Sequence, residues 1–236
     1  AKRAIQKHKK FLSLPLSTND GRSLLEFDFL LMDTKKSRMM AKLFMKYLRS
    51  SGKVHVTTPA GTDMMFYKEN RNPGFFNGVL RDGKGYSSSS IEVYVPIEET
   101  KTEGIMVLDG SLGYIGRADE PTRIIFKGGR IVDIEETQTG IRLKKYMEEY
   151  FDPRIYIAGE LGIGLNSCSN CLGNCYIEDE SAYGTFHVGL GRNIALGGVQ
   201  NAKGHFDLVC REPDIFTDNR QIMDRGKIIA PEPVLY

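Results

Sequence analysis

The chain has 236 residues, with 32 lysines and arginines against 30 aspartates and glutamates, and a formal net charge of +2. This near-neutral balance argues against a nucleic-acid or strongly acidic partner. No apolar run reaches the roughly 20 residues of a membrane-spanning helix, and the start lacks the features of a secretory signal. We therefore expect a cytoplasmic protein with no membrane contact, made of a basic segment over residues 1–21 and one domain over residues 22–236.

The hydrophobic periodicity predicts many short strands and two helices. The first strand is predicted over residues 22–31. The first helix follows from about Asp33 to Ser51, with apolar residues at three-four spacing and a cap at Asp33 or Thr34. A second helix is predicted near residues 139–151. The remaining strands are predicted over residues 53–58, 91–95, 104–108, 122–126, 130–134 and 154–158, with a final pair of hairpins in 215–229. This pattern indicates an α+β fold on a β-rich, curved or barrel-like sheet with a few helices.

The last third of the chain concentrates metal-ligand residue types in Gly-rich apolar segments. These segments are GELGIG at 159–164, GTFHVGLG at 184–191 and GHFDLV at 204–209, and they carry Glu160, His187, His205 and Asp207. Side chains two residues apart on a strand share a face, so His205 and Asp207 can reach one ion. Imidazole and carboxylate are ligands of borderline divalent metals, and we therefore expect a metal site here.

Three of the four cysteines form a second cluster, Cys168-x2-Cys171-x3-Cys175, and Cys210 lies further along the chain. In a cytosolic protein such spacing favours a metal over disulfides. The four thiolates could hold a second metal or an iron–sulfur cluster. Redox chemistry and simple reduced loop thiols remain the alternatives.

Six segments in a fixed order resemble a known family. They are TTPAGTDMMF at 57–66, IEVYVP at 91–96, GIMVLDGSL at 104–112, GELGIGLN at 159–166, EDESAYGTFHVGLGRN at 178–193 and HFDLV at 205–209. Together they resemble the thermophilic metallo-aminopeptidases of the aminopeptidase T and aminopeptidase S family, over roughly residues 50–229. Carried over residue by residue, the resemblance implies metal ligands at Glu92, Glu160, His187, His205 and Asp207.

The resemblance implies a homodimeric metallo-aminopeptidase, a hydrolase that removes N-terminal residues from peptides by a two-metal-activated water. Its ions would be two divalent metals, zinc, cobalt or manganese, acting on a peptide or small-molecule substrate. Glu180 is a candidate proton shuttle, although its acidic run can equally be a solvated turn. Arg192 is a candidate oxyanion donor, although a surface ion pair is the simpler interpretation. His55 matches no ligand of the family, and we expect it to be a satisfied strand histidine.

Three departures from the family leave the reaction open. The family carries an N-terminal α/β domain for which this chain has almost no counterpart. The position of a family tyrosine is occupied here by Ile194, and the cysteine cluster follows Glu160 where the family has none. One alternative is a catalytically altered relative that binds metal or an iron–sulfur cluster. The other is a ring-cleaving dioxygenase with one ferrous ion on His187, His205 and Asp207, against which the presence of Glu92 and Glu160 counts.

Overall fold

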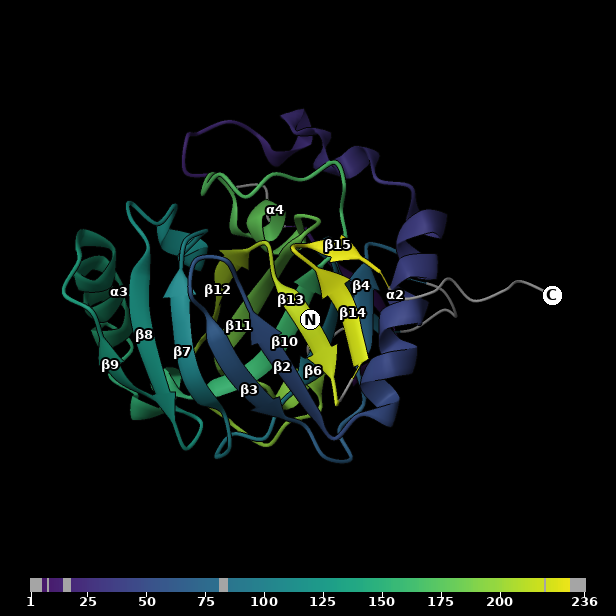
Figure 1. Cartoon of the computed structure of the whole chain (residues 1–236). Coiled ribbons are helices and arrows are strands. Elements are labelled where there is room, and N and C mark those ends of the chain that lie inside the picture. Colours follow the sequence, from purple (N-terminus) through teal and green to yellow (C-terminus); the bar gives the residue numbers. More distant parts are fainter. Residues whose placement is uncertain (1–5, 8, 15–17, 81–84, 219, 230–236) are drawn as a thin grey trace.

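The computed structural model describes residues 6–7, 9–14, 18–80, 85–218 and 220–229. Figure 1 shows two antiparallel sheets, one in front of the other, with helices at their margins. The mostly β, α+β fold class expected from the sequence is confirmed. In the described residues the strand orders are linear, so both sheets stay open and neither closes into a barrel. No helix of this part of the chain is long and apolar enough to cross a membrane.

The smaller of these two sheets carries the Gly-rich segments. Its order is β12 (His205–Arg211), β11 (Thr185–Gly191), β10 (Ala158–Gly164), β6 (Ile91–Pro96) and β4 (Gly74–Asn77). The strands β10 and β11 are buried along their whole length. This explains why the Gly-rich segments read as apolar runs, because a strand covered on both faces has no solvent side.

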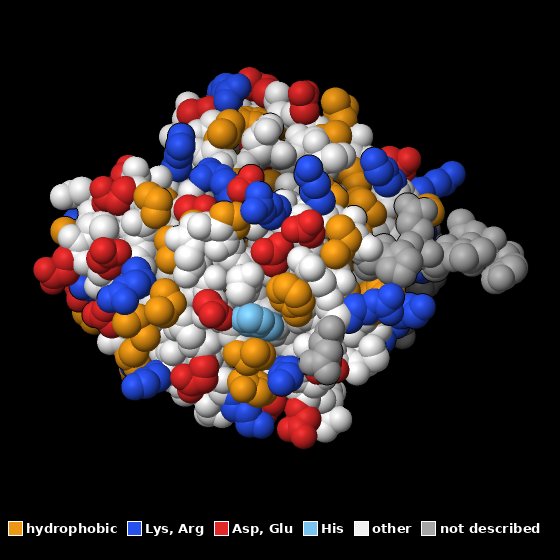
Figure 2. All heavy atoms as spheres, in the orientation of Figure 1, with side chains coloured by type: hydrophobic (Ala, Val, Ile, Leu, Met, Phe, Trp, Pro, Cys, Tyr) orange, Lys and Arg blue, Asp and Glu red, His pale blue; other side chains and the backbone are white. Residues whose placement is uncertain are grey.

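The larger sheet has eight strands. Its order is β15 (Lys227–Ile228), β14 (Arg220–Asp224), β13 (Asp214–Thr217), β2 (Lys53–Thr57), β3 (Asp63–Tyr67), β7 (Glu103–Leu108), β8 (Thr122–Lys127) and β9 (Arg130–Ile134). A separate parallel pair joins β1 (Lys10–Ser13) to β5 (Gly85–Ser88). In the view of Figure 2, acidic and basic side chains are interspersed over the surface.

One apolar core joins the two sheets. Val54 and Val56 of β2 are fully buried while His55 between them is not, as alternation along a strand requires. Leu161 of β10 and Val188 of β11 belong to the same core cluster as these valines. Each of these strands therefore turns one face toward the core, and the opposite face of the five-stranded sheet is left for other uses.

Three helices complete the described fold. Helix α2 (Thr34–Ser50) is capped by Asp33, whose side chain accepts hydrogen bonds from two backbone N–H groups, and it packs against β4 and β6. Helix α3 (Gln138–Glu148) is capped by Thr137 and packs on β8. Helix α4 (Tyr176–Ser181) lies above the sheets in Figure 1. The first two helices agree with the sequence predictions to within three residues at each end.

Two predicted strands are wrong. Residues 22–31 form two 3-10 turns, η1 (Leu24–Glu26) and η2 (Asp28–Leu31), because Ser23 and Glu26 make a reciprocal capping box that starts a turn. The second predicted strand, over residues 154–158, overlaps the 3-10 turn η4 (Pro153–Tyr156), which the Asp152 side chain caps. The GELGIG segment that follows is the body of β10.

Hairpins connect adjacent strands at residues whose backbone has a positive φ. Gly128 and Gly129, with φ of 56° and 77°, turn the chain between β8 and β9. Arg225 and Gly226, with φ of 43° and 74°, connect β14 to β15. Asp218 adopts a φ of 48° between β13 and β14, and its neighbour at 219 lies outside the described residues.

Glu99 ties together three segments that flank the five-stranded sheet. Its carboxylate accepts two hydrogen bonds from Arg71, at 2.9 and 2.5 Å, one from Asn193 Nδ2 at 2.8 Å and one from the Val199 N–H at 3.0 Å. Burial opposes its charge, but these donors prevail and lower the pKa of Glu99 to about 2.

This low pKa predicts acid sensitivity. The stabilisation is present above the ordinary pKa of 4.5 and is lost as the pH falls toward about 2. It should amount to roughly 3 kcal/mol, since each pKa unit corresponds to about 1.4 kcal/mol. Urea unfolding across this pH range should show Glu99→Gln with a weaker pH dependence than the wild type. The matched control is Glu136→Gln, at a side chain that is 89% exposed. Equal slopes in all three proteins would contradict the prediction.

Candidate metal centre

One face of the five-stranded sheet carries the polar residues singled out from the sequence. Because side chains alternate along a strand, the face opposite the core receives every second residue of β6, β10, β11 and β12. These residues include all five expected ligands, Glu92, Glu160, His187, His205 and Asp207. The inference that His205 and Asp207 share a face therefore agrees with the structure.

Glycines between these side chains provide the space that the site occupies. Gly189 pairs with Glu160 on one side and with Asp207 on the other, and Gly162 pairs with His187. A Cβ at position 162 would lie 1.8 Å from His187 Nε2. A Cβ at position 189 would lie 2.7 Å from His205 Cε1 and 2.8 Å from a Glu160 carboxylate oxygen. The polar side chains thus lie flat over strand positions that have no side chain of their own.

The side chains approach one another closely. His205 Nε2 lies 3.2 Å from Glu160 Oε2 and 3.3 Å from Asp207 Oδ1, while His187 Nε2 lies 2.9 Å from Glu92 Oε2. Ligand atoms within 4.8 Å of one another form two groups, Glu92–Glu160–His187 and Glu160–His205–Asp207. Glu160 belongs to both groups, so the five residues make one continuous set.

His205 is oriented by the backbone. Its Nδ1 lies 2.9 Å from the Arg192 carbonyl oxygen, which can only accept a hydrogen bond, so Nδ1 carries the proton. In the neutral ring the lone pair is then on Nε2, the atom that faces Glu160 and Asp207. A metal-binding histidine usually donates its other ring N–H to such an acceptor, which fixes the orientation of the ring.

Several buried atoms of the site have no hydrogen-bond partner. They are Glu92 Oε2, His187 Nδ1 and Asp207 Oδ1. Although Glu92 Oε2 is near His187 Nε2, the two are not aligned as a hydrogen bond. Buried polar atoms without partners are costly, and a cation would satisfy such an acceptor-rich set. The residues present therefore fit a divalent metal ion.

Helix α4 adds a fourth carboxylate from above. A Cβ at Gly164 would lie 2.1 Å from the Ala182 carbonyl oxygen, so the end of α4 rests on the polar face of β10. Glu180 of this helix is buried, and its carboxyl group hydrogen-bonds to Asp207. The structure thus places Glu180 buried beside the ligand set, where a solvated acidic turn had been the alternative.

Charge repulsion within the set perturbs its titration. Burial, followed by the charges of neighbouring carboxylates, raises the pKa of Glu180 well above its ordinary value, and burial also raises that of Glu160. Burial opposes the charged form of His187, but the facing Glu92 raises the pKa of this imidazole to about 9. His205 overcomes the burial penalty of Asp207 and lowers its pKa. Bound metal would take the place of these protons, so metal binding should release protons.

Arg192 contributes through its backbone. Its carbonyl oxygen holds His205, whereas its side chain is exposed and its Nε donates to the Ala202 carbonyl at 2.7 Å. The proposed role of its guanidinium as an oxyanion donor stays a prediction. Ile194, which opens the turn η5 (Ile194–Leu196), is 49% exposed. His55 is satisfied by Asp63 on the larger sheet, with 2.7 Å between Nε2 and Oδ1, as expected for a strand histidine.

The cysteines have separate apolar surroundings. Cys175 packs with Leu24, Phe29 and Ile177, Cys171 packs with Ala182 and Val209, and Cys210 belongs to the main core. Within the described residues, neither ligand group contains a cysteine. An iron–sulfur cluster or second metal on Cys168, Cys171, Cys175 and Cys210 therefore stays a prediction without structural support.

The cysteines should differ in their reactivity. Burial raises the pKa of Cys171 to about 12 and raises those of Cys175 and Cys210, which leaves these thiols protonated and inaccessible. Cys168 is partly exposed. Iodoacetamide should therefore alkylate Cys168 in the native protein and all four cysteines after unfolding, as measured by mass spectrometry. Rapid native alkylation of Cys171 or Cys210 would show that these side chains are placed differently.

Two tyrosines near the site escaped the sequence analysis. Tyr114, in the turn η3 (Gly113–Ile115), and Tyr176, at the start of α4, have ring centroids 4.1 Å apart. The charges of Asp207 and Glu180 contribute to raising the pKa of both hydroxyls, after the larger effect of burial. No local motif marks them, because they are 62 positions apart and meet only in the folded chain.

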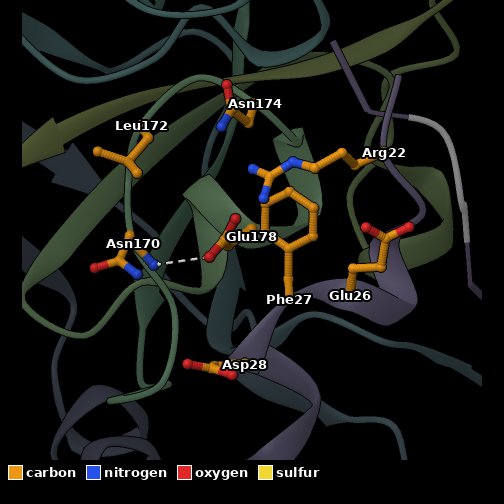
Figure 3. A pocket seen from close by; sticks show the side chains of 8 residues that line it. All are labelled: Arg22, Glu26, Phe27, Asp28, Asn170, Leu172, Asn174 and Glu178. Atoms are coloured by element: carbon orange, nitrogen blue, oxygen red, sulfur yellow. Dashed lines mark hydrogen bonds between the residues drawn. The ribbon is translucent and has the colours of Figure 1, made fainter. Parts of the chain in front are cut away.

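A separate pocket of about 240 Å³ lies on another side of α4. Figure 3 shows the Arg22 side chain beside the Phe27 ring, 4.5 Å from guanidinium carbon to centroid, and the Asn170 N–H bonded to Glu178 at 3.2 Å. Glu178 and Glu180 are two positions apart on a helix, so they point to different sides. This pocket contains no histidine and no ligand group, so it is distinct from the metal centre.

Comparison with known proteins identifies the relatives of the chain. The profile of the NicX family, described as 2,5-dihydroxypyridine 5,6-dioxygenase, matches residues 28–230. The 2,5-dihydroxypyridine 5,6-dioxygenase of Pseudomonas putida is 25% identical, with 85% of this chain and 60% of that protein covered. The chain thus spans about 60% of the length of this curated relative.

Solved structures show the same relationship at the level of the fold. The structure of 2,5-dihydroxypyridine dioxygenase from Pseudomonas putida KT2440 has a TM-score of 0.79 at 22% identity, covering 97% of this chain and 67% of that one. Wild-type AmpT from Thermus thermophilus has a TM-score of 0.59 at 15% identity, covering 83% of this chain and 54% of that one.

The assignment to the aminopeptidase T and aminopeptidase S family is therefore wrong, and so is the hydrolase or metalloprotease function with zinc or cobalt that followed from it. The matching family and the curated relative are dioxygenases, and the likeness to AmpT is one of fold. The error has a chemical reason. The aminopeptidase and dioxygenase hypotheses both assign metal ligands to His187, His205 and Asp207. The residues that bind an ion do not by themselves determine the reaction that takes place on it.

Proposed function

The chain belongs to the NicX family, and from this premise we propose that it is a metal-dependent dioxygenase that opens a dihydroxylated aromatic nitrogen ring. The observation that carries the proposal is that two histidines and an aspartate lie on one face of the five-stranded sheet, in two adjoining ligand groups that share Glu160, in a chain of this family. The chain spans about 60% of the length of its curated relative, and we propose that it shares that protein's activity.

We assign a single ferrous ion to His205 and Asp207, with His187, from the adjoining ligand group that Glu160 joins to theirs, as the third ligand. Two histidines and one carboxylate with open positions are the donor set of non-haem ferrous oxygenases. The partnerless His187 Nδ1 and Asp207 Oδ1, and the Nε2 lone pair of His205, support this choice. When bound, such an ion would supply the one-electron chemistry that lets dioxygen react with an organic ring.

The remaining carboxylates then have another use. Glu92 and Glu160 were counted against an iron site because one ion does not need both of them. Their burial beside the ligand set suits them instead to proton handling. Glu180, whose pKa is raised well above its ordinary value, is placed to hold or accept the proton of a substrate hydroxyl.

The residues around the ligands also exclude water. Leu161 and Val188 close the core face beneath the site, and Ser181 fastens α4 above it by accepting the Ile91 N–H at 2.9 Å. The side chain of His187 is 1% exposed, whereas that of His205 is 31% exposed. Substrate would therefore reach the metal from the His205 side.

The test is an oxygen-consumption assay. Protein is loaded anaerobically with ferrous ion, its metal content is measured, and 2,5-dihydroxypyridine is added with air. The proposal expects about one ion bound per chain, one dioxygen consumed per ring opened, and loss of the substrate's ring absorbance. Protein loaded with zinc is the matched control, since zinc has no redox chemistry. Fully iron-loaded protein that consumes no dioxygen with this substrate would overturn the proposal.

A further inference from the structure

We propose that Tyr114 and Tyr176 form a pair of hydroxyl groups that positions the aromatic substrate beside His205 and Asp207. The inference rests on the proposed ring-cleaving function and extends it to the residues that recognise the ring. Neither tyrosine belongs to the ligand set, and each comes from a different part of the chain.

Tyr114 is held in place by the backbone around it. Ser111 and Val209 exchange two backbone hydrogen bonds, at 3.1 and 2.9 Å, which attach the chain before η3 to β12. Gly113 has a φ of 57°, and a Cβ there would lie 3.0 Å from the Asp207 carbonyl oxygen. Because only glycine permits this approach, the turn that carries Tyr114 is fixed directly against the Asp207 segment.

Tyr176 is aligned with the site by its helix. It lies four positions before Glu180 on α4, and residues at this spacing occupy the same face of a helix. Glu180 itself reaches Asp207. Tyr176, Glu180 and Asp207 therefore follow one another from the start of α4 down to the metal ligands.

The aromatic rings of Tyr114 and Tyr176 are in contact. The ring centroids of Tyr114 and Tyr176 are 4.1 Å apart, with 48° between the ring planes. Burial, joined by the nearby carboxylates, raises the pKa of both groups, so each hydroxyl keeps its proton and remains a donor at neutral pH. Two phenolic hydroxyls on rings in contact can each give a hydrogen bond to an incoming ring oxygen.

The exposed fractions of the side chains show which of them a substrate can reach from solvent. The side chains of Glu92, His187 and Asp207 are 6%, 1% and 8% exposed. His205 is 31% exposed and Tyr114 is 46% exposed. His205 is therefore the ligand open to solvent, and the exposed Tyr114 lies on the turn that packs against β12, the strand that carries His205.

The chemistry of the pair suits a hydroxylated ring. An aromatic wall binds a planar ring by stacking or edge contacts, and a phenolic hydroxyl at its rim recognises a ring oxygen. A ring without the matching oxygen would keep the stacking contact and lose the hydrogen bond. The pair should thus discriminate by hydroxylation, which is a role in positioning and specificity.

The experiment compares Tyr114→Phe and Tyr176→Phe with the wild type. Each variant keeps the ring and removes one hydroxyl. Tyr146→Phe is the matched control, because Tyr146 is likewise paired with a second tyrosine, with 2.8 Å between its hydroxyl and that of Tyr150, but lies on α3. Iron content and the unfolding midpoint are measured first, so that a variant with altered folding is recognised and the other tyrosine variant is used.

Binding is measured anaerobically on iron-loaded protein, with 2,5-dihydroxypyridine and with unsubstituted pyridine as probes. The loss of one hydrogen bond should weaken binding of the dihydroxylated probe by about 5- to 10-fold in the two variants, with pyridine binding unchanged. In steady state the effect should fall on KM more than on kcat. Tyr146→Phe should match the wild type throughout.

The outcomes separate this inference from the proposed function. Tyrosine variants that bind 2,5-dihydroxypyridine as tightly as the wild type would overturn the inference, even if all proteins turn it over. A wild type that binds neither probe would also overturn it. If the wild type binds 2,5-dihydroxypyridine without consuming dioxygen, and binding still depends on the two hydroxyls, the proposed reaction fails and the inference stands.

Discussion

Replacing His205 by alanine should lower ferrous-ion affinity by more than about 100-fold and remove ring cleavage at ordinary iron concentrations. Removing a group that only orients a metal ligand already costs about 10- to 100-fold in metal affinity. His205 is itself a proposed ligand, so its removal should cost more. It is also the imidazole closest to both Glu160 and Asp207, and a backbone carbonyl fixes its orientation. Equilibrium dialysis against ferrous ion, followed by the oxygen-consumption assay, measures both effects.

His55→Ala is the matched control for this variant. His55 is also a strand histidine with a carboxylate neighbour, 2.7 Å from Asp63, and its side chain is similarly exposed at 34%. It lies on the eight-stranded sheet and belongs to neither ligand group in the described residues. Its removal should leave iron binding intact. Normal iron binding by His205→Ala, or loss of binding by His55→Ala, would show that the metal is elsewhere.

The second large effect is expected from Gly162→Ala. One methyl group at this position would lie 1.8 Å from His187 Nε2, closer than any real contact allows. The backbone at 162 is ordinary strand, so alanine itself can adopt it, and the clash alone must move the imidazole. Overpacking of this kind costs about 1–3 kcal/mol in stability. We expect iron affinity and ring cleavage to fall by more than about 100-fold.

Gly52→Ala provides the control, because a Cβ at position 52 meets no atom within 4 Å. Iron binding, unfolding free energy and activity are measured for both variants and the wild type. Gly52→Ala should resemble the wild type in all three. If Gly162→Ala retained full iron binding and activity, His187 would not need the position that it has over β10, and its assignment as a ligand would fail.

Local patterns predicted much of the fold. Helix α2 was found from its periodicity and its Asp33 cap, and strands β8 and β9 were predicted at residues 122–126 and 130–134. The failures have a common cause. A short alternating run such as residues 22–31 fits a strand, but the capping box of Ser23 and Glu26 starts a turn that packs Leu24 and Phe29 into a small side cluster.

The candidate site was predictable in its residues and not in its reaction. The spacing His205-x-Asp207 was enough to place both side chains on one face of β12. Glu92 and Glu160 were retained in the ligand set but were taken to imply a second metal and peptide hydrolysis. The same carboxylates serve equally well as buried proton acceptors around one ion, and sequence spacing does not distinguish these uses.

What the sequence determined by itself was therefore the local chemistry. The alternation of β12 and the strand glycines of β10 and β11 already specify a polar face with space for imidazoles. Only the tertiary structure brought Glu180 of α4 to Asp207 and set Tyr114 beside Tyr176. These contacts join residues that are tens of positions apart. They form only when α4 and η3 pack onto the five-stranded sheet, and no local pattern records that event.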